Sequence, residues 1–449
     1  MRNKILNQLR PFRIALIILS VFLLLVIILG IVVPTVRTVV ANSTPVVSIS
    51  AENDTEYQRG DQINPADFHV TAIHENGGKS ELGTDEFKIN RKTLRPIGDT
   101  TEVTITYNGD ESISCKTNVK TEREKIVGFQ VGYPEISGVT AVLYSNGELC
   151  FEGEGDALVC NEGEYPWSDY EGMEDNPILS ISFEEGVTPS NMNYWFEDVE
   201  TLTYVDSIPA SVQSMERTFA NCTGLAEAVD WSECTNLYNI DGVYYGCTSL
   251  KETVPLIASI RSAYQAYSGC TSLVSCPDSS GAESLSDASE MYYGCSNLAE
   301  AEIGPSVETM SMMFLDCINL RRMPAIPEGA IDLSEAFRNC VTLGSAEGDG
   351  ETENLLTGIP STAENISSMF ADCNLLRGEL FIDCNAEEFS NLFSGRTCKS
   401  TEVNLTGLSQ LLDVYANTNE YGNVFVNGKS PDPNKTNASE ILDADAGKS

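Results

Sequence analysis

Histidine is almost absent from this chain of 449 residues, which holds only His69 and His74. Because no imidazole follows, a Ser/His/Asp or Cys/His catalytic pair is hard to build in the long C-terminal part. The sequence also has no Cys-x-x-Cys pair and no glycine-rich phosphate loop, which leaves no candidate for a zinc site or a nucleotide cofactor. We therefore predict a protein that is not an enzyme and that needs no cofactor.

Basic residues are also few. The chain has 27 Lys and Arg against 66 Asp and Glu, which gives a net charge of −39. A surface this acidic repels phosphate backbones, so we expect no nucleic-acid partner. The first 51 residues depart from this composition, because they contain five basic residues and no acidic one.

A long apolar run occurs once, over residues 14–36, where 23 residues carry no charge. A helix of that length spans a hydrocarbon core of ~30 Å. Four basic residues precede the run and one follows it, so we expect residues 1–13 to form a cytoplasmic stub, the run to be a transmembrane signal-anchor, and the rest to lie outside the cell. The alternative is a signal peptide cleaved near Ala41, which would leave a secreted protein.

Residues 45–122 have the pattern of β-strands. Apolar and polar side chains alternate over residues 68–72 and 103–107, and the pairs Gly77-Gly78 and Asn108-Gly109 are typical of hairpin turns. This pattern predicts an antiparallel β-sandwich, and it resembles the Ig-like modules of bacterial surface proteins. His69 and His74 are five residues apart, so on one strand they point to opposite faces. We interpret both as solvent-facing structural side chains.

One motif recurs through the second half of the chain. Its core is aromatic-x-x-Cys, with a Leu three residues after the Cys and an apolar or small residue seven before it. The repeat cysteines are Cys222, Cys247, Cys270, Cys295, Cys317, Cys340 and Cys373. Their spacings are 25, 23, 25, 22, 23 and 33 residues, and the last contains an acidic insertion around residues 347–353. Degenerate copies flank the seven, so we predict about nine coils over residues 189–400.

A repeat of ~23 residues cannot bury its own apolar face, so successive units must stack into a solenoid. We expect a short strand after each Leu and a helical turn before each aromatic residue. The predicted fold class is therefore an α+β solenoid, preceded by the all-β sandwich and the membrane helix. We further expect a β-rich lead-in over residues 126–188, a C-terminal cap over residues 401–428 and a disordered tail over residues 429–449.

The unit Met-x-x-Met-Phe-x-x-Cys-x-x-Leu, as at residues 310–320, resembles the BspA-like class of bacterial leucine-rich repeats. The resemblance covers nearly half the chain. It implies a cell-surface protein that binds an extracellular protein or glycan, with adhesion as the commonest family role. The competing hypothesis is an envelope spacer or assembly component with no foreign ligand. An extracellular hydrolase fits less well, since no nucleophile motif is present.

The cysteines allow two interpretations. The repeat cysteines are expected to pack as small buried side chains, although coils ~5 Å apart also bring neighbouring Cα atoms within reach of a disulfide. If any pair is oxidised, we expect it to be Cys150 and Cys160, which flank a Gly-rich turn. The acidic clusters around residues 152–156 and 347–353 could hold calcium or remain solvated loops, and they lack a regular ligand spacing.

Strand positions just after each Leu should point away from the core and form the binding face. The charged residues there are Glu227, Lys251, Glu252, Glu300, Arg321, Arg322 and Arg377. Acids dominate the early coils and arginines the later ones, a polarity that could orient a protein partner. The plain alternative is that these charges are solvated and bind nothing.

Overall fold

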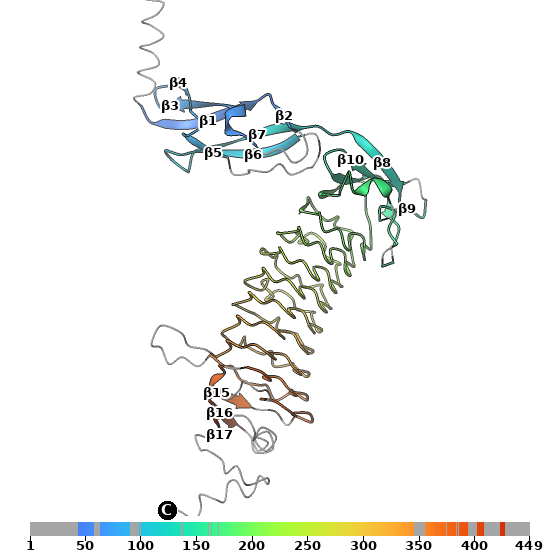
Figure 1. The fold of residues 1–449 in the computed structure, drawn as a ribbon, viewed down its shortest axis with the longest axis vertical. Helices are drawn as coiled ribbons and strands as arrows, with labels where there is room; N and C mark the ends of the chain where they lie inside the picture. Colours follow the sequence, from blue (N-terminus) through green and yellow to red (C-terminus); the bar gives the residue numbers. More distant parts are fainter. Residues whose placement is uncertain are drawn as a thin grey trace, which may run out of the picture. The chain divides into compact units, whose positions relative to one another are not determined.

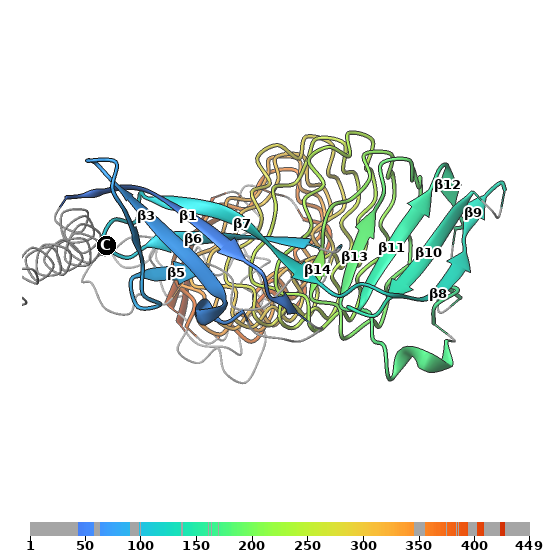
Figure 2. The same cartoon turned by 90° about the horizontal axis from the view of Figure 1, so that it is seen from above.

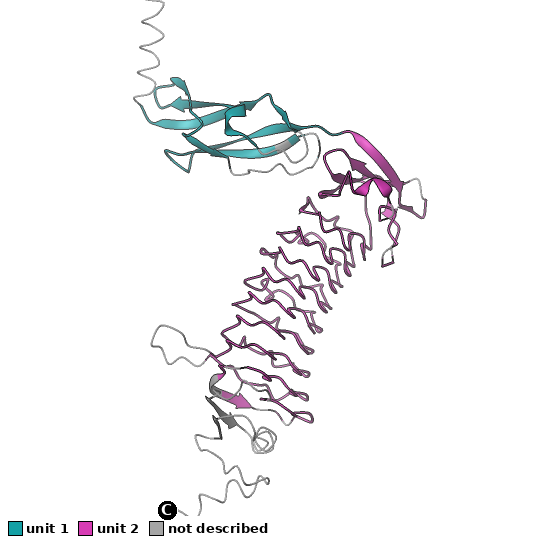
Figure 3. Cartoon of the chain, in the orientation of Figure 1, with its two compact units in different colours: residues 1–123 teal, residues 124–449 magenta. Residues whose placement is uncertain are grey.

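A computed structural model describes residues 44–57, 63–89, 98, 100–135, 138–159, 161–162, 164–168, 170–344, 355–373, 375–382, 384, 386–393, 402–407 and 423–426. The chain divides into two compact units, Met1–Arg123 and Glu124–Ser449, which Figure 3 colours separately. Within the described residues, no helix has the length and apolar character needed to cross a membrane. The predicted membrane segment at residues 14–36 and the predicted tail at 429–449 lie outside the described residues.

Unit 1 contains two β-sheets. Its strands are β1 (Val46–Asn53), β2 (Glu56–Tyr57), β3 (Phe68–His74), β4 (Lys79–Glu81), β5 (Phe87–Ile89), β6 (Thr100–Tyr107) and β7 (Ser114–Thr121), with one 3-10 turn at Pro65–Asp67. The sheet orders are β1-β3-β4 and β2-β7-β6-β5. All pairs are antiparallel except β2 with β7, which is parallel.

The period-2 pattern explains the core of unit 1. Val70 and Ala72 on β3 are fully buried and pack in one cluster with Val103 and Ile105 on β6. The two histidines do point to opposite faces of β3. His69 is exposed and lies 3.3 Å from Glu81, but the expectation that both face solvent is wrong. His74 is buried, and both of its ring nitrogens have hydrogen-bond partners: Nδ1 pairs with the Thr44 carbonyl and Nε2 with the Ser80 hydroxyl, both at 2.7 Å.

Unit 2 begins with a β-rich cap. Its strands are β8 (Lys125–Gln130), β9 (Gly132–Tyr133), β10 (Val139–Tyr144), β11 (Glu148–Gly153), β12 (Asp156–Ala157), β13 (Ser180–Phe183) and β14 (Tyr204–Val205), with a 3-10 turn at Glu171–Met173. The main sheet has the order β14-β13-β11-β10-β8, seen in Figure 2. Its pairing changes from antiparallel to parallel at β11, and this change starts the solenoid.

The coils after the cap stack in register (Figure 1). A parallel ladder of isolated bridges links one residue of each coil to the same position of the next. The residues of this ladder are Asn191, Ser214, Asn239, Ser262, Asp287, Thr309, Asp332, Asn365 and Glu388. Nine coils are therefore joined among the described residues. The ladder lies one residue before the apolar position that precedes each aromatic.

The helical turn that we expected before each aromatic is absent from the described coils, and a chain of β-turns replaces it. From Met215 to Asn221, every second backbone N–H donates to a carbonyl of the next coil, at 2.6 to 3.0 Å. Of the intervening N–H groups, those of Thr218 and Ala220 close turns within their own coil, and that of Glu216 donates to the Asn193 side chain of the preceding coil at 2.9 Å. Backbone donors thus alternate between two coils, which an α-helix does not allow.

Two positions in each coil have left-handed backbone. The residue just before the repeat cysteine has a φ of 58° to 75°, and it is Asn, Asp or Gly in all seven copies. These three residue types tolerate a positive φ most readily. The other position lies five residues before the cysteine and has a φ of 50° to 58°. It carries Arg217, Glu290 and Met312 among others, so the inter-coil hydrogen bonds must offset its cost of ~1–2 kcal/mol per residue.

The strand predicted after each Leu is regular at the N-terminal end of the array, where β14 follows Leu202 and pairs in parallel with β13, and near the C-terminal end of the described coils. There β15 (Arg377–Ile382) pairs in parallel with β16 (Glu402–Gly407), and β16 pairs with β17 (Asn423–Val426). The strand expected over residues 250–254 is reduced to a single bridge between Glu227 and Glu252. A second bridge joins Ser275 to Glu300.

Aromatic rings form a column through the interior of the solenoid. The column consists of Phe196, Phe219, Tyr244, Tyr267, Tyr292, Phe314, Phe337, Phe370 and Phe393. Neighbouring centroids are 5.4 to 5.8 Å apart. Trp167 of the cap stacks on Phe196 at 5.7 Å and closes the N-terminal end of the column. Offset stacking at this distance adds to the free energy gained by burying each ring.

A second column consists of the repeat cysteines, which are fully buried. Each thiol donates to the backbone carbonyl of the aromatic residue in the preceding coil, at 3.0 to 3.2 Å. For example, Cys317 Sγ donates to the Tyr292 carbonyl at 3.2 Å. Burial raises the pKa of the Cys247 thiol to about 12, and those of its neighbours in the column also rise. These side chains therefore remain protonated at neutral pH.

Candidate functional site

The surface that follows each repeat Leu holds the residues proposed above as a binding face, and we call it the post-leucine surface. Six of them are exposed there: Glu227, Lys251, Glu252, Glu300, Arg321 and Arg322. The seventh, Arg377, begins β15, but its side chain is not among those that the structure describes. Stacking brings equivalent positions of successive coils together, so residues far apart in sequence become neighbours.

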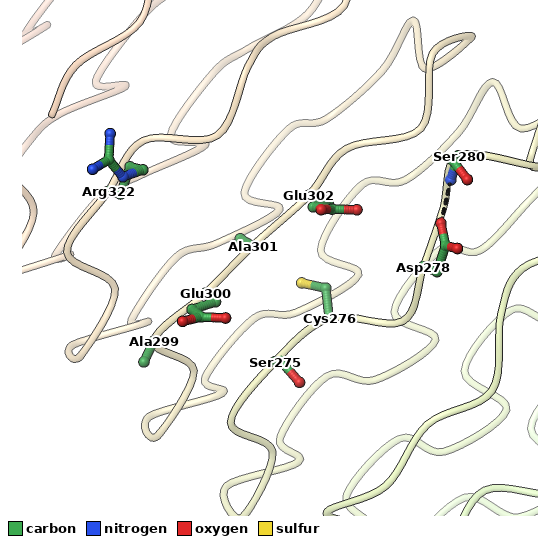
Figure 4. A pocket seen from close by; sticks show the side chains of 9 residues that line it. All are labelled: Ser275, Cys276, Asp278, Ser280, Ala299, Glu300, Ala301, Glu302 and Arg322. Carbon is green, nitrogen blue, oxygen red and sulfur yellow. Dashed lines mark hydrogen bonds between the residues drawn. The ribbon is translucent and has the colours of Figure 1, made fainter.

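Two hollows lie on this surface. The first has a volume of about 740 Å³ and spans three coils. Its polar lining comes from Ser275, Asp278 and Ser280 on one coil, Glu300 and Glu302 on the next, and Arg322 on the third. Figure 4 shows the two glutamates on one segment, between Arg322 on one side and the serines on the other.

The second hollow adjoins the first, because Ala299, Glu300 and Arg322 line both. It has a volume of about 570 Å³ and adds Arg321 and two asparagines, Asn297 and Asn319. The Asn319 amide donates to the Ser296 carbonyl at 2.8 Å, which fixes the side chain at the rim. Three of the seven predicted residues, Glu300, Arg321 and Arg322, are thus brought into one continuous depression. Glu227, Lys251 and Glu252 lie on earlier coils and line neither hollow.

Several residues of this depression were not predicted from the sequence, among them Asp278, Glu302 and Asn319. Asp278 accepts a hydrogen bond from the Ser280 N–H at 2.9 Å. Hydrogen bonds from Ser280 hold the pKa of the Asp278 carboxyl below its ordinary value. A repeat alignment extended past the Leu could have found Glu302, which lies four residues after Leu298, whereas Asn319 lies inside the motif, one residue before Leu320.

The chemistry of the depression suits binding. It combines carboxylates and hydroxyls from earlier coils with two guanidinium groups from a later coil. Cys276 also lines it, but burial raises the pKa of this thiol to about 12, so the sulfur keeps its proton at neutral pH. A protonated thiol is a weak nucleophile and a weak metal ligand.

The other residues that were predicted from the sequence lie elsewhere in the chain. Cys150 is buried on β11, and Cys160 lies outside the described residues, so their disulfide stays a prediction. In the first acidic cluster, the Tyr144 hydroxyl donates to Glu152, and Asp156 accepts from the Ser190 hydroxyl at 3.0 Å. The second acidic cluster, around residues 347–353, is outside the described residues.

Comparison with known proteins gives weak likenesses. No protein-family model matches the sequence, and no curated protein matches it. The chain is similar to the crystal structure of a leucine-rich repeat protein from Bacteroides ovatus, with 14% identity, coverage of 65% of this chain and 80% of the other, and a TM-score of 0.39. It is also similar to a leucine-rich repeat protein from Eubacterium ventriosum, with 16% identity, 67% and 84% coverage, and a TM-score of 0.35.

A third similar structure is a leucine-rich cell surface protein from Faecalibacterium prausnitzii. It shares 15% identity, the match covers 68% of this chain and 96% of the other, and the TM-score is 0.28. Identities and TM-scores this low do not by themselves establish the fold. The evidence for the repeat solenoid is the set of inter-coil hydrogen bonds within the chain itself.

Proposed function

We propose that this protein is a membrane-anchored surface protein of the BspA-like leucine-rich repeat class that binds an extracellular partner through its post-leucine surface. The unit 1 sandwich would serve as an Ig-like stalk, and residues 14–36 as the anchor. The observation that carries the proposal is the depression of mixed charge over three successive coils, lined by Glu300, Arg321 and Arg322.

The arrangement of charge favours a protein partner over a neutral glycan. In the earlier coils the acids Glu227, Glu252 and Glu300 outnumber the single base Lys251. Arg321 and Arg322 follow in the next coil, so the balance of charge along the surface changes from acidic to basic. A partner with the opposite order of charges is both attracted and oriented by such a surface. Because these side chains are exposed, the attraction should weaken at high salt.

A direct test is binding of the full-length chain, held in nanodiscs, to cultured cells, extracellular matrix and mucin. Saturable binding to at least one of them is expected, and it should fall by about tenfold or more in an Arg321→Glu/Arg322→Glu variant. An Arg261→Glu/Lys125→Glu variant makes the same change of charge at exposed positions that line neither hollow and lie outside the post-leucine surface. This control should retain most of the binding.

Two results would count against the proposal. If the double arginine variant binds as well as the original chain, the post-leucine depression is not the binding surface. If no saturable binding to cells, matrix or mucin is found, the protein is better explained as an envelope spacer that holds other components at a fixed height.

A further inference from the structure

A separate hollow is formed by residues that precede the repeat cysteines of neighbouring coils. We call it the tyrosine hollow. It has a volume of about 560 Å³ and crosses four coils. Its lining consists of Glu290, Tyr293, Met312, Leu315, Asp316, Arg338, Asn339 and Asp372. This volume falls in the range of roughly 300–1,000 Å³ that is usual for small-molecule sites. None of these residues lines the post-leucine depression.

One wall of the tyrosine hollow is aromatic. Tyr293 is 39% exposed, although the interior column of the same coils buries its aromatic rings completely. The half-buried side chains of Met312 and Leu315 lie beside it in the lining. Register places them together, because the Gly294 N–H donates to the Leu315 carbonyl at 2.8 Å. The hollow therefore offers a flat apolar patch that is open to solvent.

The other walls carry planar polar groups that hold one another in place. The Arg338 guanidinium pairs with Glu335 at 2.7 Å and lies 3.8 Å from Asp372. The Asn339 amide donates to the Asp316 carboxylate at 2.7 Å. On the opposite side, Glu290 accepts from the Gln265 amide at 2.7 Å and from the Tyr264 hydroxyl at 3.1 Å. Each carboxylate has further lone pairs with which it can accept another hydrogen bond.

We propose that the tyrosine hollow binds a neutral oligosaccharide. One pyranose ring would pack its C–H face on Tyr293, and its hydroxyls would donate to Asp316 and Asp372 and accept from Arg338. A sugar presents an apolar face and a rim of hydroxyls, and the hollow matches both. Because the groups are already paired, little side-chain entropy is lost when the sugar binds.

The net charge of the lining determines which class of sugar the tyrosine hollow can bind. The lining contains Glu290, Asp316 and Asp372 against the single positive charge of Arg338. This excess of negative charge repels sialylated and sulfated glycans. The charge of the post-leucine depression is closer to balanced, because its three carboxylates are accompanied by two arginines, Arg321 and Arg322. The two sites therefore take ligands of different classes, and the inference goes beyond the function proposed above.

The test is saturation-transfer NMR and calorimetry of the full-length chain in nanodiscs against a panel of glycans. The panel contains neutral oligosaccharides of hexoses and N-acetylhexosamines, together with sialylated and sulfated ones. We expect binding by at least one neutral member, and a loss of about tenfold or more in Tyr293→Ala, which removes the stacking surface. Tyr293→Phe should retain the affinity, because it keeps the ring.

Tyr238→Ala is the matched control, because Tyr238 is 46% exposed but does not line the hollow. It should bind as the original chain does. Equal urea midpoints for the variants separate lost binding from lost folding. The proposal is overturned if only anionic glycans bind, if no neutral glycan binds, if the hollow captures only proteins, or if Tyr293→Ala binds normally. Charge reversal at Arg321 and Arg322 should leave glycan binding intact, so the two proposals fail separately.

Discussion

Two tyrosines of the interior column differ in a way that predicts opposite effects of the same substitution. Tyr244 and Tyr267 occupy the same position in adjacent coils, and their rings are 5.6 Å apart. The Tyr244 hydroxyl accepts a hydrogen bond from the Val229 N–H at 2.8 Å. The Tyr267 hydroxyl is buried, and no described residue forms a hydrogen bond with it. Burial raises the pKa of both phenols, so both are protonated at neutral pH.

The structure sets the size of each effect. Leaving a buried polar group unsatisfied costs about 1–3 kcal/mol. Tyr267→Phe removes such a group and should raise the free energy of unfolding by about 1 kcal/mol. Tyr244→Phe instead leaves the Val229 N–H without its acceptor, and should lower the free energy of unfolding by about 1–3 kcal/mol. Both variants keep the ring and its stacking, so the comparison isolates the hydroxyl.

Urea unfolding of the full-length chain, followed by tryptophan fluorescence, measures both changes. Trp231 stacks on Tyr244 at 6.1 Å and reports on this part of the column. The expected order of midpoints is Tyr267→Phe, then the original chain, then Tyr244→Phe. The reasoning is refuted if Tyr267→Phe is the less stable of the two variants, because its hydroxyl would then have a partner.

Two further predictions concern the backbone and the thiols. Asn339 has a φ of 58°, so Asn339→Val should lower the free energy of unfolding by about 1–2 kcal/mol more than Asn339→Gly does, as measured by urea midpoints. Equal midpoints for the two variants would show that this backbone is not left-handed. The buried thiols predict a loss of stability in alkali, because the folded state holds their protons more tightly. Stability should be unaffected below the ordinary thiol pKa of 9.0 and should fall as the pH rises towards about 12, the pKa of Cys247. Cys247→Ala should lose less stability over this range, and an equal loss would contradict the assignment.

The repeat register could be predicted from the sequence because it rests on burial. The aromatic, Cys and Leu of each unit face a dry interior, and any other register would expose one of them. At Phe314, Cys317 and Leu320, the structure buries all three predicted positions. Exposure of Arg321 and Arg322 follows from the same register, since they come directly after the Leu.

The path of the backbone within a coil could not be predicted. Met310, Met313, Phe314 and Cys317 have the spacing of one face of an α-helix, and this spacing suggested a helical turn. Successive β-turns with left-handed residues at Met312 and Asp316 produce the same spacing of buried side chains. The recurrent Asn, Asp or Gly before the cysteine was a signal for such turns. The tyrosine hollow could not be predicted either, because its residues come from four coils and no single repeat contains all of them.

The column of rings has a consequence for how such a chain can change in length. Each of the seven full coils presents a ladder residue, a ring and a thiol at equivalent positions, so a duplicated coil of 22 to 25 residues can be inserted between two others and make the same kinds of contact. Each such duplication would lengthen the stack by one ring step, 5.4 to 5.8 Å. The outward positions of the new copy would then be free to diverge. Gene duplication within the array can therefore supply new surface while the interior stays the same.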